Sequence, residues 1–321
     1  MYLLADIGAT NTRLQAANEA GLQGDPLVVS TPAIAQVTDL VAPIEALRAA
    51  QPIPETWTQV VFAVAGPVNE AGEAVITNTG LALSNGELTQ LLGAPAQLIN
   101  DFEALAYGLP AFSRLRQVGG AARIPGRNQC ILGPGTGLGV ATLVYGRDLS
   151  QPPVVVPSEG GHVDLSPGSH LELELWGALA AEHGQVCWET VLCGQGLVNL
   201  YKAMCQVWGS QPEALQPADV TERGLSMADP VCHQTLETFA GLLGSAAANF
   251  ALTSLAHGGV YLAGGITPIL ADFLETSPLR RRFEEKGKMT HLVQQIPLFI
   301  VEDDYPGLLG AWQFASLNNP G

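Results

Sequence analysis

The chain has 321 residues, of which 30 are acidic and only 14 are basic, so its formal net charge is −16. This balance disfavours nucleic acid and anionic membrane surfaces as partners, because both attract basic patches. No apolar run is long enough to span a membrane, and Asp6 interrupts an N-terminus that lacks the basic segment of a secretory signal.

The first predicted element is a hairpin around the segment Asp6–Arg13, which reads Asp-Ile-Gly-Ala-Thr-Asn-Thr-Arg and has apolar residues on both sides. Gly8 lets a ligand approach the backbone closely, and the N–H groups and hydroxyls of such a turn can hold phosphate oxygens. Because Asp6 would repel a bare phosphate, a divalent cation between the two is the economical explanation. An ordinary hairpin whose turn prefers Gly and Asn is the alternative.

The next 100 residues alternate between strand and helix patterns. Buried strands are expected at 60–65, 74–78 and 96–99, and helical spacing is found at 37–50 and 84–92. Ser84 is the expected N-cap of the second helix, with Glu87 completing a capping box. This alternation indicates a mixed or parallel α/β sheet, and a domain boundary is expected near residues 107–110.

A second Gly/Thr turn, Gly133–Gly139, lies between apolar runs at 130–132 and 140–144. It repeats the opening pattern and suggests an internal duplication. Its spacing is neither that of a P-loop nor that of a Rossmann turn. Two such turns, the second with the Thr136 hydroxyl, favour a polyphosphate gripped from two sides.

The remaining elements are read from periodicity and capping residues. We expect an amphipathic helix at 171–182 with acidic residues outside, a long buried helix at 233–256 capped by Gly258-Gly259, a strand at 260–263 and a helix at 307–317. The five cysteines are odd in number and contain no C-x-x-C pair, which predicts free thiols in a reducing compartment rather than a zinc site or a disulfide framework.

Polar side chains that could carry chemistry follow some of these elements. Asp101, at a predicted strand end, is either a helix N-cap or the base that takes a hydroxyl proton, as in kinases. The loop Glu159–His162 presents a carboxylate and an imidazole, either to one ligand or as a surface ion pair and a structural histidine. Glu189 stands among apolar residues, as a helix-surface charge or as a buried carboxylate with a specific partner. Sugar hydroxyls would suit such carboxylates.

In this order, the motifs of the chain resemble those of bacterial glucokinases in the hexokinase–actin–Hsp70 superfamily. The branch is the non-ROK one, since the zinc cysteine cluster of the repressor/open-reading-frame/kinase family is missing. The resemblance rests on these segments: Asp6–Arg13, Ile99–Phe102, Gly133–Gly139, Glu159–His162, Glu189, Ala263–Ile266 and Pro306–Gly310. It implies a two-domain α/β fold of the actin-like ATPase (ribonuclease H-like) type, with an interdomain active-site cleft. The small domain would comprise residues 1–109 plus 303–321, and the large domain residues 110–302.

The resemblance also implies an activity: ATP-dependent phosphorylation of glucose at the 6-hydroxyl, giving glucose 6-phosphate for glycolysis in the cytoplasm. Asp101 would be the general base, and Asp6 would lie near Mg²⁺. The implied glucose contacts are Asn100, Asp101, Glu159, His162 and Glu189. The implied ATP contacts are Asp6, Gly8, Ala9, Thr10, Asn11, Arg13, Gly135, Thr136, Gly137, Gly264 and Gly265. Such enzymes are usually homodimers.

Two positions depart from the family pattern. Ala9 stands where a second Gly is usual, which is tolerable only if this residue does not need a positive φ. The segment Asn78–Leu81 lacks the aromatic residue often seen near the sugar, which leaves substrate selectivity open. The alternatives are therefore a kinase for another hexose or an N-acetylated sugar, a polyphosphate-dependent glucokinase, or a catalytically silent sugar sensor. The sensor is disfavoured because the catalytic positions are all present.

Overall fold

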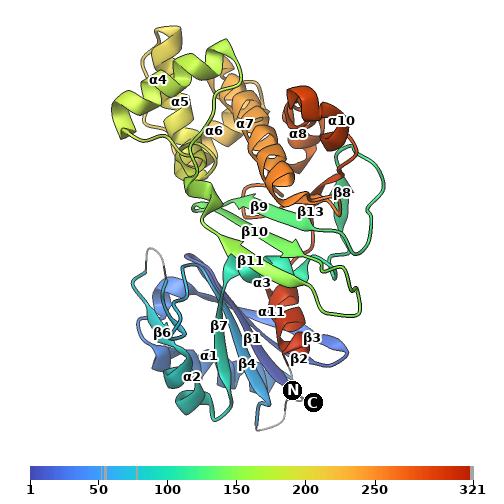
Figure 1. The fold of residues 1–321 in the computed structure, drawn as a ribbon. Helices are drawn as coiled ribbons and strands as arrows, with labels where there is room; N and C mark the ends of the chain where they lie inside the picture. The colour runs from blue at the N-terminus through green and yellow to red at the C-terminus, as the bar shows by residue number, and fades with distance from the viewer. Residues whose placement is uncertain (52, 54–55, 77–78, 319–321) are drawn as a thin grey trace. The chain divides into compact units, whose positions relative to one another are not determined.

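The strands of the computed structural model, which describes residues 1–51, 53, 56–76 and 79–318, build two main sheets. Apart from strand β11 (Val154–Ser158), each sheet lies within a separate unit of the chain (Figure 1). Unit 1 comprises Met1–Ser113, Ser150–Pro157 and Asp303–Gly321, and unit 2 comprises Arg114–Leu149 and Ser158–Glu302. Strand β11 crosses the boundary between them.

Unit 1 is built on a five-stranded sheet in the order β3-β2-β1-β4-β7. Its strands are β1 (Tyr2–Ile7), β2 (Asn11–Asn18), β3 (Gly21–Ser30), β4 (Gln59–Val64) and β7 (Ala96–Asn100), with a separate small hairpin of β5 (Glu73–Val75) and β6 (Ala82–Ser84). Its helices are η1 (Thr31–Ala33), η2 (Val37–Leu40), α1 (Val41–Ala50), α2 (Asn85–Leu92), α3 (Asp101–Gly108) and α11 (Pro306–Leu317).

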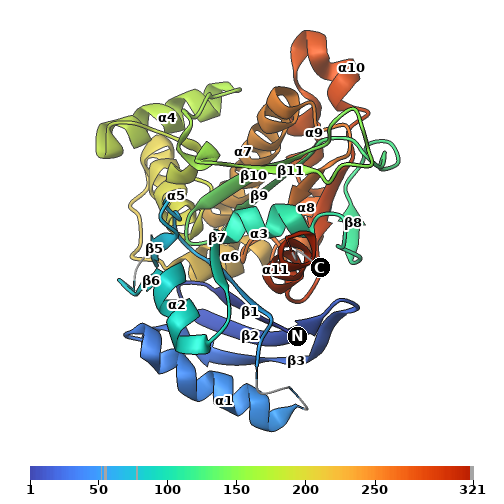
Figure 2. The same cartoon turned by 60° about the horizontal axis from the view of Figure 1, so that its bottom comes forward.

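Both faces of this sheet are covered, as the alternation along β1 requires. Leu3 and Ile7 point to a core that includes Ile44 of α1 and lies on the α1 and α2 side. Leu4 points to the other core, where Leu308 of α11 packs with α3. Figure 2 shows α1 and α11 on opposite sides of β1 and β2. A near-continuous apolar strand such as β1 is typical of a sheet buried on both faces.

The second sheet has six strands in the order β11-β10-β9-β12-β13-β8, and all of them except β11 lie wholly within unit 2. The strands within unit 2 are β8 (Leu115–Gln117), β9 (Gln129–Pro134), β10 (Leu138–Val144), β12 (Val260–Leu262) and β13 (Leu298–Val301). The helices are η3 (Gly160–His162), α4 (His170–His183), η4 (Trp188–Thr190), α5 (Gly194–Trp208), α6 (Pro217–Leu225), α7 (Pro230–Ser254), α8 (Ala271–Thr276), α9 (Leu279–Glu284), η5 (Gly287–Met289) and α10 (Thr290–Val293).

The predicted duplication is confirmed by strand pairing rather than by sequence identity. In unit 1, β1 pairs antiparallel with β2 and parallel with β4, which pairs parallel with β7. In unit 2, β9 pairs antiparallel with β10 and parallel with β12, which pairs parallel with β13. Each unit therefore repeats one hairpin followed by two parallel strands, the mixed α/β arrangement that the sequence predicts.

Several predicted boundaries differ from the observed ones. The helix expected at 37–50 begins as the short 3₁₀ helix η2, and α1 starts only at Val41. The strand expected at 74–78 ends at Val75, and its last two positions, 77 and 78, lie outside the described residues. The long helix starts earlier than expected, at Pro230, because Asp229 caps it by accepting the N–H groups of Val231 and Cys232.

Two further expectations about helices are wrong. The long helix α7 is closed by Leu255 in the left-handed conformation (φ 47°), not by Gly258-Gly259. Helix α4 does not keep all its acidic residues outside, since Glu172 is buried and both its oxygens accept from Arg282 Nη2 at 2.9 Å. A buried carboxylate persists only with such a partner.

The Ser84 N-cap and the free cysteines are confirmed, but the predicted capping box is not complete. Helix α2 begins after Ser84, whose hydroxyl accepts from the Glu87 N–H at 3.2 Å. The Glu87 carboxylate accepts from that hydroxyl rather than from the Ser84 backbone, so the capping box is only half formed. All five cysteines are free thiols. None of the helices in the described part of the chain combines the length and apolarity of a bilayer-spanning segment.

Candidate active site

The hairpin of unit 1 forms as predicted and is fixed on both sides. Strands β1 and β2 pair with Asp6 opposite Arg13. The Gly8 N–H donates to the Asn11 carbonyl at 3.0 Å, and the Thr31 N–H donates to the Thr10 carbonyl at 2.9 Å. The second bond ties the turn to the end of β3, so the backbone that would meet a phosphate is held in place.

Ala9 does not have a positive φ, which was the condition for tolerating a side chain at this position. Among the described non-glycine residues, only Met227 and Leu255 have a positive φ. A methyl group at position 9 therefore costs no backbone strain, and the departure from the family pattern does not distort the hairpin.

The Asp6 carboxylate is packed tightly inside unit 1. Arg13 Nη1 lies 3.3 Å from Asp6 Oδ2 across the hairpin. On the other side, a Cβ atom on Gly307 of α11 would come within 2.8 Å of the Asp6 Cγ. Burial raises the pKa of Asp6, although the Arg13 charge opposes this effect. Gly307 thus leaves room for the Asp6 carboxylate. The sequence analysis included Gly307 only as part of the segment Pro306–Gly310 and gave no physical reason for a glycine there.

Asn100 and Asp101 stand where β7 passes into α3. The Asn100 side-chain oxygen accepts from the N–H groups of Phe102 at 2.9 Å and Glu103 at 3.2 Å, while its Nδ2 donates to the Gly66 carbonyl at 3.1 Å. Asn100 is therefore the N-cap of α3, and the interpretation of Asp101 as that cap is wrong. The cap fixes Asn100 and leaves Asp101 as the first helical residue.

The Asp101 carboxyl group has an unusual ionisation. Burial raises its pKa from 3.8 to about 7, and the nearby negative charge of Asp6 adds to the effect. Hydrogen bonds to the charged form oppose the shift, among them the Phe102 N–H that donates to Asp101 Oδ1 at 3.0 Å. A carboxyl group whose pKa lies near neutrality is suited to general base catalysis.

The second Gly/Thr turn, in unit 2, joins β9 to β10. The Gly135 N–H donates to the Gly137 carbonyl at 2.8 Å, and the Gly135 carbonyl accepts from the Gly194 N–H of α5 at 2.9 Å. Thr136 is exposed at the tip. Gly264, with φ 82°, follows β12, and a side chain on it would meet the Pro134 carbonyl. The structure thus places Gly135–Gly137 and Gly264-Gly265 side by side, at the end of β9 and β12.

The loop after β11 carries the predicted Glu159 and His162. Its two glycines belong to the short 3₁₀ helix η3, and neither has a positive φ. They allow η3 to lie directly on β10, since a side chain on Gly161 would overlap the Leu138 carbonyl. Glu159 is exposed, and His162 is largely exposed with its Nε2 3.9 Å from Glu189 Oε1. The loop therefore presents both groups outward from unit 2.

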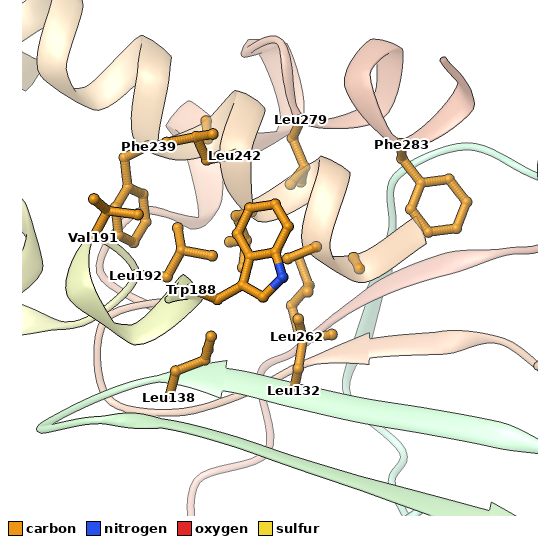
Figure 3. Packing of buried hydrophobic residues seen from close by; sticks show 14 of the residues in the cluster. Leu132, Leu138, Trp188, Val191, Leu192, Phe239, Leu242, Leu262, Leu279 and Phe283 are labelled. Atoms are coloured by element: carbon orange, nitrogen blue, oxygen red, sulfur yellow. The ribbon is translucent and has the colours of Figure 1, made fainter. Parts of the chain in front are cut away.

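Glu189 is held by the turn that it neighbours. Its Oε2 accepts from the Leu138 N–H at 2.7 Å, and a side chain on Gly137 would collide with the same oxygen. The preceding residue, Trp188, is 1% exposed and packs in the core beside Leu138, Leu132 and Leu262 (Figure 3). Glu189 has the specific partner that the second interpretation requires, but its side chain is 32% exposed rather than buried. Sequence reasoning did not find its bond to Leu138; the glycine at 137 was the available signal.

The predicted residues thus form two clusters, one in each unit. Unit 1 brings together the Asp6 hairpin with Asn100 and Asp101, and unit 2 brings together the Thr136 turn, Gly264-Gly265, Glu159, His162 and Glu189. No group of three or more His, Cys, Asp or Glu side chains in the described segments could hold a metal ion by itself. Magnesium needs only one or two carboxylates when phosphates supply other ligands, and Asp6 meets that requirement.

Comparison with known proteins identifies the family. The Glucokinase family model matches residues 3–318. A glucokinase from Chromobacterium violaceum is 39% identical over 316 residues, covering 96% of this chain and 87% of the relative. A glucokinase from Stenotrophomonas maltophilia is 38% identical over 329 residues, covering 98% and 94%.

Solved structures agree with this result. The crystal structure of a glucokinase from an Antarctic psychrotroph has a TM-score of 0.86 and 32% identity, covering 98% of both chains. A Balamuthia mandrillaris glucokinase in complex with glucose, at 24% identity and a TM-score of 0.78, shares the fold, covering 98% of this chain and 93% of that one. The fold is the two-domain actin-like sugar kinase fold, and the chain belongs to the glucokinase family.

Proposed function

We propose that this protein transfers the γ-phosphoryl group of ATP to the 6-hydroxyl of glucose. The observation that carries the proposal is the Asp101 carboxyl group, whose pKa is raised to about 7 at the start of α3 beside Asp6. Its relatives at 36–39% identity are named glucokinase. No observation favours an N-acetylated sugar, another hexose or a silent sensor.

Asp101 acts as the general base. It takes the proton of the 6-hydroxyl as that oxygen forms its bond to the γ-phosphorus and the bond from phosphorus to the leaving ADP oxygen breaks. A base with a pKa near neutrality is both deprotonated often enough and basic enough to help this transfer. Asn100 supports it, because its cap bonds to α3 fix the backbone that carries Asp101.

Sugar recognition falls to side chains with acceptor oxygens or a ring nitrogen. Asn100, Asp101, Glu159, His162 and Glu189 bind the glucose hydroxyls, since carboxylates and imidazoles accept and orient several of them at once. The Glu159 carboxylate has no hydrogen bond or ion pair among the described residues, which leaves both its oxygens available for a ligand.

Phosphate recognition uses the two Gly/Thr turns. In the first turn, Ala9, Thr10, Asn11 and Arg13 offer N–H groups, a hydroxyl and a guanidinium. Gly8, whose N–H already donates to the Asn11 carbonyl, offers backbone without a side chain. In the second turn and the segment after β12, Gly135, Thr136, Gly137, Gly264 and Gly265 offer a hydroxyl and backbone without side chains. Such groups suit phosphate oxygens. Asp6 would hold Mg²⁺, which neutralises phosphate charge when bound.

The remaining parts of the proposal concern the whole molecule. The small domain comprises residues 1–109 plus 303–321 and the large domain residues 110–302, and residues of both serve the one reaction. The protein acts in the cytoplasm as a homodimer, and size-exclusion chromatography with light scattering measures that state.

The test is a panel of sugars and phosphoryl donors with the purified protein, read as sugar-dependent ADP release. Glucose with ATP and Mg²⁺ is expected to give ADP and a product phosphorylated at the 6-position, as assigned by phosphorus NMR. Asp101→Ala is expected to lower turnover roughly 10²–10⁴-fold. Faster turnover with N-acetylglucosamine, another hexose or polyphosphate would replace the proposal by that activity, and sugar binding without ADP release would indicate a sensor.

A further inference from the structure

Glu189 is tied to two parts of unit 2 at the same time. Its Oε2 accepts the Leu138 N–H at 2.7 Å, and Leu138 directly follows the turn Gly135–Gly137. Its Oε1 faces the other way, 3.9 Å from the Nε2 of the exposed His162. With 32% of its side chain exposed, the carboxylate is accessible on one side and bonded to the turn on the other.

The turn leaves room for this carboxylate by omitting a side chain. Gly137 does not have a positive φ, so its backbone would accept any residue. A Cβ atom at this position would overlap Glu189 Oε2 and lie 3.1 Å from its Cδ. Gly135, two residues earlier, is different, because a Cβ there would meet only the Gly265 nitrogen at 3.9 Å. A side chain at position 137 would therefore have to displace the Glu189 carboxylate.

The surrounding core positions both residues of the Glu189–Leu138 hydrogen bond. Trp188 is buried next to Leu138 in the cluster shown in Figure 3, so the residues adjoining the hydrogen bond pack against each other. Below the turn, the Gly194 N–H at the start of α5 donates to the Gly135 carbonyl at 2.9 Å. Displacing the Glu189 carboxylate would thus loosen the turn, because the Leu138 N–H would lose this acceptor.

We propose that Glu189 couples sugar binding to binding of the phosphoryl donor, one carboxylate oxygen serving the sugar and the other fixing the phosphate turn through Leu138. This inference rests on the proposed function. The inference adds a positioning role for Glu189. It also means that Gly137 affects sugar affinity, although Gly137 itself offers no group to a sugar. Because linked binding is reciprocal, a substitution that disturbs the phosphate turn should change the affinity for the sugar, and loss of the carboxylate should change the affinity for the phosphoryl donor.

The test uses two binding measurements on the full chain, each made without the other ligand. Calorimetry gives the affinity for glucose alone, and a second titration gives the affinity for the β,γ-imido analogue of ATP with Mg²⁺. Gly137→Ala is expected to weaken glucose binding about tenfold or more, because the displaced Glu189 carboxylate would lose a hydrogen bond to the sugar. Gly135→Ala is the matched control, because it places a methyl group in the same turn without touching Glu189 and should leave glucose affinity within about twofold.

The reciprocal measurement uses Glu189 itself. Glu189→Ala is expected to weaken binding of the ATP analogue about tenfold, because the Leu138 N–H loses its acceptor. Glu189→Gln should keep nucleotide affinity, since the amide oxygen can still accept from Leu138, while glucose affinity falls. Glu159→Ala is the control here: it removes a proposed sugar carboxylate that does not touch the turn, so only glucose binding should change.

Unchanged nucleotide affinity in Glu189→Ala would overturn the inference and assign Glu189 to the sugar alone. Unchanged glucose affinity in Gly137→Ala would overturn it as well. Thermal unfolding shows whether each variant folds, and if Gly137→Ala does not, the comparison of Glu189→Ala with Glu189→Gln decides. The nucleotide measurement requires no sugar, so it tests the link even where the panel of sugars has refuted glucose as the substrate.

Discussion

Replacing Asp101 with Asn should make the protein more stable and nearly inactive, and the gain in stability should depend on pH. The folded structure raises the pKa of this carboxyl group from 3.8 to about 7. A folded state with the higher pKa holds the proton more tightly than the unfolded state does. The stabilisation from this group is therefore complete below pH 3.8 and is lost as the pH rises to about 7.

The size of the effect follows from the shift. One pKa unit corresponds to about 1.4 kcal/mol, so a shift of about three units is worth about 4 kcal/mol. Asn cannot ionise and keeps an oxygen for the Phe102 N–H. Relative to the wild type, Asp101→Asn should thus gain about 1.5 kcal/mol in the free energy of unfolding at pH 5 and about 4 kcal/mol at pH 8.

The assay is urea unfolding of both proteins at the two pH values, with EDTA and without ligands. Asp25→Asn, which removes an exposed carboxylate from β3 of the same unit, is the control and should show no such difference. A gain that is equal at pH 5 and pH 8 would refute the raised pKa. Turnover of Asp101→Asn should fall by about 10²–10⁴, equivalent to about 3–5 kcal/mol of barrier. Turnover close to that of the wild type would refute the role of Asp101 as base.

Two further substitutions test the packing of charged groups. Glu172→Ala should lower the free energy of unfolding by about 3 kcal/mol, because it leaves the buried Arg282 of α9 with the Glu285 carboxylate but without Glu172. Urea unfolding measures this loss, and Glu174→Ala on the exposed side of the same helix should cost far less; equal losses would contradict the argument. Gly307→Ala should lower kcat/KM for ATP about 10–100-fold, because the new methyl group displaces Asp6. Steady-state kinetics test this, with Gly86→Ala, which meets no atom within 4 Å, as the control that should match the wild type.

Local patterns were sufficient for much of the fold. The hairpin Asp6–Arg13 was predictable because its turn residues and flanking apolar runs are contiguous, and Ser84 was recognisable as a cap because capping involves residues three apart. The repeat of this hairpin at Gly133–Gly139 also follows from sequence, since both turns join antiparallel strands that pair next to a parallel one.

Ends of elements were less predictable because competing local signals decide them. Gly258-Gly259 is a standard helix stop, yet α7 ends at Ser254 and is capped by Leu255, which adopts the left-handed conformation at some cost. Asn100 and Asp101 are both good caps, and only the observed bonds from Phe102 and Glu103 show which one serves. Glu172 was expected outside because a helical pattern does not reveal an arginine 110 residues away.

The sequence by itself determined the family, the order of the elements and the residue types available for chemistry, because these depend on contiguous segments and their spacing. Only the tertiary structure decided how those groups behave. The pKa of Asp101, the first residue of α3, depends on burial and on Asp6, which lies on β1. The role of Glu189 depends on the Leu138 N–H, 51 residues away. Both effects act through space over a few ångströms, so they exist only once distant segments have packed together.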